Sequence, residues 1–269
     1  MGETASIDVA FLPSEVRPAE LAVVLDVLRA SSTIAAALSA GYSRVLCCKD
    51  PERAEELRGP GRVLAGEQEC RPIPGFDYGN SPGKLEAGDG RELVLSTTNG
   101  CPAILAAAEA SDEVLIGALL NLDALVEAIP PGADLSVVCS GTHGRFALED
   151  AYAAGRLVAR LRGERTDAAR AAERLASAYP NAYEPLDESA DAAVLKETDQ
   201  EDDIAFCARE SVLATLPYVT GVSSGVATVS ASDGTGRWRE RSNADGKASE
   251  ETPRERNKLS LMRTARSFS

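Results

Sequence analysis

The sequence predicts an α/β fold in which a mainly parallel sheet carries helices on both faces, in three layers (α/β/α). Short apolar runs rich in Val, Leu and Ile alternate with longer Ala-rich stretches of helical character between residues 7 and 231. Apolar runs without polar alternation are typical of strands buried on both faces, and strands separated by helices pair in parallel. Ligands of such sheets bind at the carboxyl ends of the strands, so we expect the functional site there.

Three segments repeat one order, an apolar strand, a polar turn and an Ala-rich helix: 21–41, 92–110 and 134–161. Apolar runs predict further strands at 7–12, 43–49, 61–67, 113–118 and 223–231. Helical periodicity predicts helices near 51–57, 122–128, 149–162, 166–178 and 201–215.

The rest of the chain divides into two polar regions. Residues 179–200 are acidic, and we expect a surface loop or a short lid there. Residues 233–269 are poor in apolar side chains and rich in charge, Ser and Gly, which predicts a disordered tail. Residues 1–232 then form a single α/β domain, either as one unit or as two closely packed lobes divided near residue 130.

The charge of the chain restricts its partners. The formal net charge is -14, and a nucleic acid or an anionic membrane would require a basic face. The sequence has neither an apolar run of about 18 residues nor a basic and then apolar N-terminal segment. The six cysteines form no C-x-x-C pair. We therefore expect a cytoplasmic protein with a small-molecule substrate; a homo-oligomer is compatible with the sequence.

Polar turns follow the three repeated strands at 26–29, 96–100 and 140–144. Each turn precedes a helix N-terminus, where free backbone N–H groups and the helix dipole favour an anion. A fourth polar segment, GFDYGNSP at 75–82, contains Gly75 and Gly79, which we expect to have positive φ. These segments together predict an anion-binding edge.

Carboxylates accompany the same turns. Asp26 interrupts an apolar run, Glu67 ends a strand, and Glu149 and Asp150 open a helix. Acids that converge on a strand edge are the ligands that Mg²⁺ prefers, together with waters and phosphate oxygens. The chain lacks the P-loop, the dinucleotide fingerprint and the G-x-S-x-G elbow, and a serine triad would have to use His143, the single histidine.

The segments DVLRASST, GE followed by PGFDYGNSP, STTNG and CSGTHGRFALEDAYAAG resemble the signature blocks of the 2-phosphosulfolactate phosphatase family, in family order. The resemblance implies an α/β fold and Mg²⁺-dependent hydrolysis of a phosphate ester on a short hydroxy acid. The matching positions are Asp26, Arg29, Ser31, Thr33, Glu67, Gly75, Asp77, Gly79, Asn80, Ser81, Thr98, Asn99, Gly100, Gly141, Thr142, Glu149 and Asp150.

The chain also departs from the family pattern. Gln68 stands where the family usually has a basic residue, and Cys101 and Pro102 stand where it has a threonine and a basic residue. Fewer cationic partners would change how a second acidic group, such as a sulfonate, is held. The phosphatase class is therefore better determined than the particular substrate.

Phosphate-ester hydrolysis depends on positioning and on charge stabilisation. We expect Mg²⁺ on Asp26 and Glu149, with Glu67 or Asp150 as a further ligand, and Arg29 on a phosphate oxygen. The expected substrate-binding groups are Ser31, Asn80, Ser81, Thr98, Asn99, Gly100, Gly141 and Thr142. The attacking group is either a metal-activated water or the Asp26 carboxylate. His143 is either the general acid or a turn cap, and Asp77 either binds metal or fixes its loop.

Two alternatives remain open. Cys139 and Arg145 form C-x5-R between a strand and a helix, the arrangement of thiol-dependent phosphatases. The glycine and hydroxyl turns would equally suit a non-catalytic binder of small phosphorylated acids. The carboxylates disfavour this second alternative, because they repel an anion unless a metal intervenes.

Overall fold

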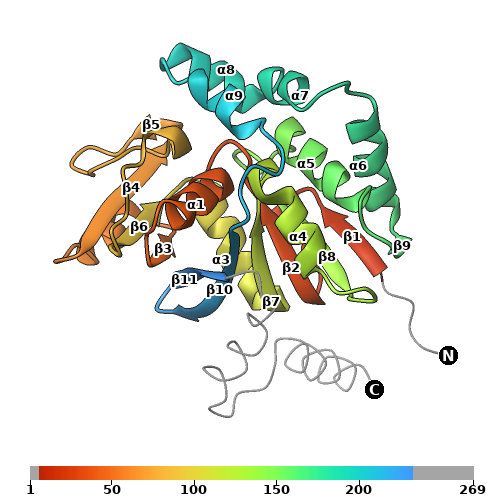
Figure 1. The fold of residues 1–269 in the computed structure, drawn as a ribbon, viewed down its shortest axis with the longest axis horizontal. Helices are drawn as coiled ribbons and strands as arrows, with labels where there is room; N and C mark the ends of the chain where they lie inside the picture. Colours follow the sequence, from red (N-terminus) through yellow and green to blue (C-terminus); the bar gives the residue numbers. More distant parts are fainter. Residues whose placement is uncertain (1–5, 233–269) are drawn as a thin grey trace, which may run out of the picture.

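The computed structural model describes residues 6–232, so the tail predicted at 233–269 lies outside the described residues. These residues form one eleven-stranded sheet flanked by helices (Figure 1). The strands are β1 (Ser6–Ala10), β2 (Ala19–Leu25), β3 (Arg44–Cys48), β4 (Arg62–Gln68), β5 (Arg71–Pro72), β6 (Glu92–Ser96), β7 (Ser111–Gly117), β8 (Leu135–Cys139), β9 (Glu164–Arg165), β10 (Leu216–Ser223) and β11 (Val226–Ser232).

The strand order is β5-β4-β6-β3-β11-β10-β7-β2-β8-β1-β9. The α/β class is confirmed, but the sheet is mixed. The hairpin β10–β11 lies antiparallel between β3 and β7, and the short edge strand β5 runs antiparallel to β4. The sequence did not predict β10, because Pro217 and Gly221 are residues that strands disfavour. Its register with β11 shifts between Val219 and Gly221.

The helices lie close to the predicted ranges, except near the C-terminal end. They are α1 (Ala30–Ser39), α2 (Pro51–Glu56), α3 (Gly100–Ala110), α4 (Leu122–Ala128), α5 (Leu148–Val158), α6 (Asp167–Ser177), α7 (Tyr183–Asp187), α8 (Ala190–Glu197) and α9 (Asp202–Cys207). Short 3-10 turns are η1 (Pro13–Glu15), η2 (Pro82–Lys84) and η3 (Leu119–Asn121). No helix within residues 6–232 has the length and apolar character needed to cross a membrane.

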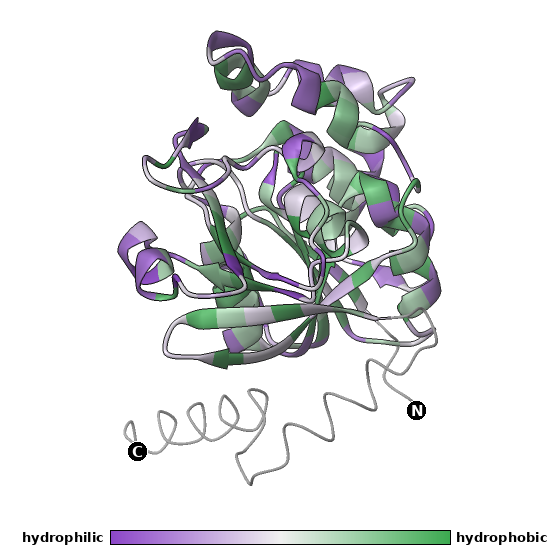
Figure 2. Ribbon diagram, turned by 60° about the vertical axis from the view of Figure 1, so that its left-hand side comes forward, coloured by the Kyte–Doolittle hydropathy of each residue, from purple (hydrophilic) through white to green (hydrophobic). Residues whose placement is uncertain are grey.

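Helices cover both faces of the central strand β2. Val23 and Leu25 belong to a hydrophobic cluster that includes Leu157 of α5. Their neighbour Val24 belongs to a second cluster, with Ile34 of α1 and Ile104 of α3. Successive strand residues point to opposite faces, so this alternation explains why residues 21–25 of β2 are all apolar. Figure 2 shows that the central strands are mostly hydrophobic, whereas the outer helices carry hydrophilic residues.

The helix predicted at 201–215 is too long, because α9 ends at Cys207. Beyond it, the backbone N–H groups of Ser211 and Leu213 donate to the carbonyls of Leu119 and Leu120. Those donors are therefore unavailable for a continuing helix, and the chain runs beside η3 toward β10.

The loop predicted at 179–200 is also wrong, because this segment contains α7 and α8. The Ser189 hydroxyl accepts a hydrogen bond from the Ala192 N–H and caps α8. Ala192 and Leu195 are fully buried in the same hydrophobic cluster as Leu157. Their three-residue spacing is a weak helical signal, which the many surrounding acids concealed.

Gly155 determines how closely α5 approaches α6. A Cβ there would overlap the Ala172 carbonyl oxygen and lie 2.7 Å from the Ala176 Cβ. We expect Gly155→Ala to lower the free energy of unfolding by about 1–3 kcal/mol, because neither backbone can move aside easily. Urea denaturation measures this change. Gly221→Ala is the matched control, since nothing lies within 4 Å of its Cβ position; an equal loss in both variants would contradict the close packing.

Candidate active site

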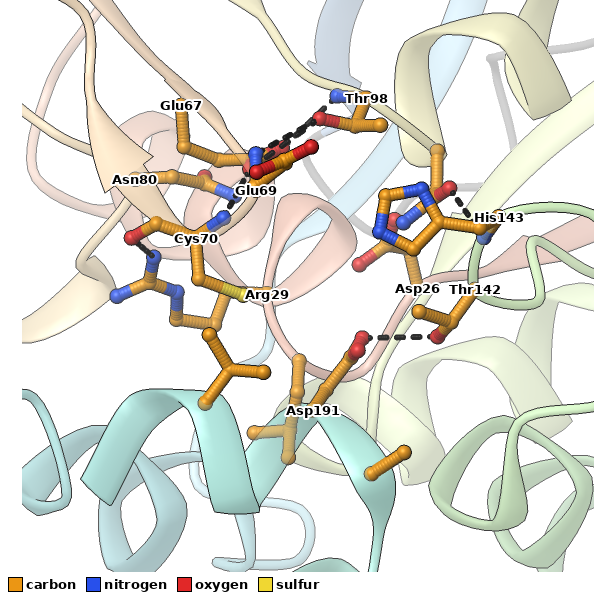
Figure 3. A pocket seen from close by; sticks show the side chains of 14 residues that line it. Asp26, Arg29, Glu67, Glu69, Cys70, Asn80, Thr98, Thr142, His143 and Asp191 are labelled. Atoms are coloured by element: carbon orange, nitrogen blue, oxygen red, sulfur yellow. Dashed lines mark hydrogen bonds between the residues drawn. The ribbon is translucent and has the colours of Figure 1, made fainter. Parts of the chain in front are cut away.

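A cavity of about 190 Å³ lies where several strands end. Asp26 follows β2, Glu67 lies near the end of β4, Thr98 follows β6, and Thr142 follows β8. Asp191, from α8, faces the same space. In Figure 3 the side chains of Asp26, Thr142 and His143 gather on one side of this space, and those of Arg29, Cys70 and Asn80 lie on the other.

Asp26 is a buried carboxylate of the cavity, with 7% of the residue exposed. Its Oδ1 accepts a hydrogen bond of 2.9 Å from the Ala30 N–H, while no donor in the described chain contacts Oδ2. A Cβ at Gly100 would lie 2.6 Å from Oδ2, so only glycine allows α3 to begin here. Burial first, and then the charges of Asp150, Asp191 and Glu67, raises the pKa of Asp26 well above its usual range.

Asp150 joins the turns after β2 and β8. One carboxylate oxygen accepts from the Val27 N–H at 2.8 Å, and the other accepts from the Ser140 hydroxyl at 2.9 Å and the Gly141 N–H at 3.1 Å. Burial raises the pKa of Asp150 to about 6, although these hydrogen bonds oppose the change. Its neighbour Glu149 is equally buried, and burial and then the Asp150 charge raise its pKa. Neither carboxylate lines the cavity.

Glu67 joins the turns after β4 and β6. Its Oε1 accepts from the Thr98 N–H at 2.8 Å, and its Oε2 accepts from the Cys70 N–H at 2.7 Å and from the Thr98 hydroxyl at 3.3 Å. Glu67 lines the cavity, but both of its oxygens already have donors. The structure thus gives Glu67 and Asp150 a common role in holding loops together.

Arg29 is almost fully enclosed, with 2% exposed, yet it lines the cavity. Its Nη1 donates to Asp203 and to Gln200, both at 2.6 Å, and its Nη2 donates to the Cys70 carbonyl at 3.2 Å. The Leu28–Arg29 peptide bond is cis. Sequence reasoning did not identify Gln200 or Asp203, because they lie more than 170 positions from Arg29.

The 75–82 segment presents Asn80 to the cavity. Asn80 is 3% exposed, and its side-chain Oδ1 has no hydrogen-bond partner in the described chain. The Thr33 hydroxyl holds the Asn80 carbonyl at 2.9 Å, and the Ser81 hydroxyl donates to Asp203 at 2.6 Å instead of facing the cavity. Asp77 accepts from the Leu64 N–H at 2.8 Å, so it fixes this segment.

One backbone prediction for this segment is half correct. Gly75 has φ +88°, whereas Gly79 has no positive φ. Gly79 instead lies against the Pro72 side chain, which a Cβ would approach to 3.2 Å.

The remaining predicted residues mostly shape the turns. The Ser31 hydroxyl donates to the Asp26 carbonyl at 2.7 Å and accepts from the Asp26 N–H. Asn99 accepts from the His143 N–H at 3.1 Å, and His143 is exposed at the cavity with φ +51°. The structure brings these predicted residues to the cavity wall: Asp26, Arg29, Glu67, Asn80, Thr98, Asn99, Thr142 and His143. It does not bring Ser31, Ser81, Gly100, Gly141, Glu149 or Asp150 there.

Helix α8 supplies a wall that the sequence did not indicate. Asp191 accepts from the Thr142 hydroxyl at 3.0 Å, and Ala190 and Val194 line the cavity beside it. Burial raises the pKa of Asp191, and the Glu67 charge adds to this effect. The Ala190–Val194 spacing would place both side chains on one helix face, but the helix itself was not predicted.

Cys139 does not have the environment of a nucleophilic thiol. It is buried in the core, and burial first, then the Asp150 and Glu149 charges, raises its pKa well above the ordinary value. A reactive thiol requires the opposite shift. Arg145, its expected partner, is exposed to solvent.

Comparison with known proteins identifies the chain's relatives. The family model for 2-phosphosulpholactate phosphatase matches residues 9–221. A probable 2-phosphosulfolactate phosphatase of Thermotoga petrophila is 41% identical over 221 residues, covering 80% of this chain and 96% of the relative. The 2-phosphosulfolactate phosphatase of Methanothermobacter thermautotrophicus is 34% identical over 198 residues, covering 73% and 85%. The chain therefore belongs to the 2-phosphosulfolactate phosphatase family and is a phosphoric monoester hydrolase.

Proposed function

We propose that the cavity beside Asp26 is the active site of a Mg²⁺-dependent phosphatase whose substrate is the phosphate monoester of a small hydroxy acid, of the 2-phosphosulfolactate type. One observation carries the proposal. The buried carboxylates of Asp26, Glu67 and Asp191 line the same small cavity as the Arg29 guanidinium. An anionic substrate could approach these carboxylates only with a cation between them. The relatives named as 2-phosphosulfolactate phosphatases support the substrate class.

The carboxylates that line the cavity are the kind of ligand that Mg²⁺ prefers, but few of them lie close together. Within residues 6–232 no group of three or more His, Cys, Asp or Glu is close enough to enclose a metal ion. Mg²⁺ usually keeps several waters and is held by one or two carboxylates plus substrate phosphate oxygens. Asp26 suits this role, because its Oδ2 has no donor in the described chain, and Asp191 is the second buried carboxylate of the cavity whose oxygens are not both occupied. Glu67, Glu149 and Asp150 remain predicted ligands.

The bound ion would polarise the phosphoryl group and offset its charge. The chain's own residues would do the rest of the work. Arg29 would bind a phosphate oxygen, and Asn80 would orient the ester or carboxylate oxygens through its buried amide. His143, at the cavity wall, could deliver the proton that the leaving alkoxide requires. Asp26 would either form a phospho-enzyme or orient the attacking water.

We also propose a three-layer architecture, a site at the carboxyl ends of the strands and a cytoplasmic location. Helices against both faces of β2 support a three-layer arrangement with the site at the carboxyl ends of the strands. The net charge of -14 supports a protein that binds no nucleic acid. The cytoplasmic location stays a prediction from the sequence pattern. A homo-oligomer is compatible with this proposal.

Removal of metal should abolish phosphate release. We expect EDTA-treated protein to hydrolyse no phosphorylated C3 hydroxy acid and Mg²⁺ to restore the rate, because the carboxylates otherwise repel the substrate. A phosphate-release screen of such esters, with and without Mg²⁺, measures this. Cys139→Ser should keep the wild-type rate, since the thiol is buried. Full activity in EDTA together with an inactive Cys139→Ser would favour the thiol route, and no release from any ester would favour a binder.

Neutralising Asp26 should remove catalysis while leaving the fold intact. Asp26→Asn keeps the size of the side chain, and we expect kcat to fall roughly 10²–10³-fold, the usual cost of one preorganised electrostatic group. Steady-state kinetics in saturating Mg²⁺ checks this. Asp167→Asn on α6, whose side chain is fully exposed, is the matched control and should keep the wild-type rate. Wild-type kcat in Asp26→Asn would exclude Asp26 from the chemistry.

A further inference from the structure

We propose that Asp203 is a positioning residue that orients the Arg29 guanidinium toward the phosphate. The proposal rests on the function proposed above, in which Arg29 binds the phosphate. Asp203 lies on α9, away from the strand ends that supply the rest of the site, and it does not line the cavity. Its effect would therefore be indirect, through the residues that it holds, and Arg29 is the one of these with a charge.

The contacts of Arg29 use three of its five N–H donors and leave two available. A guanidinium has five N–H donors. Asp203 and Gln200 take the two on Nη1, and the Cys70 carbonyl takes one on Nη2. The Nε–H and one Nη2–H have no acceptor in the described chain, and the atoms Nε and Nη2 lie on one edge of the guanidinium. Two parallel N–H groups on one edge are what bidentate binding of a phosphate requires.

Asp203 is itself rigidly held. Its Oδ2 bonds Nη1 of Arg29 at 2.6 Å, and its Oδ1 accepts from the Ser81 hydroxyl at 2.6 Å, so neither oxygen can rotate away without losing a partner. The next residue, Ile204, and Cys207 one turn later are fully buried in the core. The core thus fixes α9, α9 fixes Asp203, and Asp203 fixes both Arg29 and the segment that carries Asn80.

The consequence for binding is large because the cavity has few cations. Arg29 is the one Lys or Arg among the described residues that line it. A guanidinium released from Asp203 would turn, and its remaining edge would no longer face the same point. Misplacement of a binding group by about 1 Å can cost on the order of a hundredfold in rate.

The test compares two neighbouring acids of α9, the buried Asp203 and the exposed Asp202. We expect Asp203→Asn to raise KM for the ester, and the Kd for inorganic phosphate measured by calorimetry in Mg²⁺, by at least about tenfold, within the range that misplacement of a binding group produces. Asp202→Asn should change neither. If both variants matched the wild type, the proposal would fail while the proposed function stood. If the wild type released no phosphate from any ester yet bound phosphate more tightly than Asp203→Asn, the proposed function would fail and the positioning role would stand.

A double-mutant cycle separates positioning from general stability. The substitution Arg29→Lys keeps the positive charge but removes the planar, two-pronged set of N–H donors. In an Arg29→Lys background, Asp203→Asn should therefore add little further loss of phosphate affinity, because contacting residues couple. An equal loss in both backgrounds would show a merely structural role. If Asp203→Asn does not fold, Asp203→Glu keeps the charge and moves the carboxylate by one methylene; it should fold and bind phosphate more weakly, and wild-type affinity there would overturn the proposal.

Discussion

The burial of several carboxylates at one end of the sheet is the constraint on which this structure depends. Asp26, Glu67, Asp150 and Asp191 lie at one edge of the sheet, and burial raises the pKa of Asp26, Asp150 and Asp191. Asp150 and Glu67 offset the cost of burial with backbone and hydroxyl donors, and they thereby connect neighbouring turns. Asp26 and Asp191 each keep an oxygen without a donor among residues 6–232. The hydrogen bonds of Glu67 and Asp150 therefore hold the loops together, and the remaining oxygens of Asp26 and Asp191 are those we propose for a cation.

Gly100 and Ser31 determine where the Asp26 carboxylate lies. Gly100 lets α3 begin directly against the Asp26 carboxylate, which no side chain there would permit. Ser31 closes the turn that carries Asp26 through two hydrogen bonds to its backbone. The polar turn after β2 therefore holds Asp26 from both sides, through Ser31 within the turn and through the start of α3 packed against it.

The sequence predicted the parts of the protein that are governed by local pattern. The repeated order of strand, turn and helix located Asp26, Thr98 and Thr142, because the carboxyl ends of parallel strands share an edge. It failed where distant segments meet. Hairpin β10–β11 inserts into the middle of the sheet with a Pro and a Gly in β10, and α8 is a short helix hidden among acids. Asp203 lies 174 positions from Arg29, so no local pattern could reveal their ion pair.

The central claim is that the Asp26 carboxylate holds a divalent cation. Calorimetric titration of Mg²⁺ into metal-free protein, for the wild type and for Asp26→Asn, tests it without reference to any substrate. We expect saturable binding to the wild type and binding at least about tenfold weaker in Asp26→Asn, since a neutral amide is a poorer ligand than a carboxylate. Equal affinity in the two proteins, or no binding by the wild type, would contradict it.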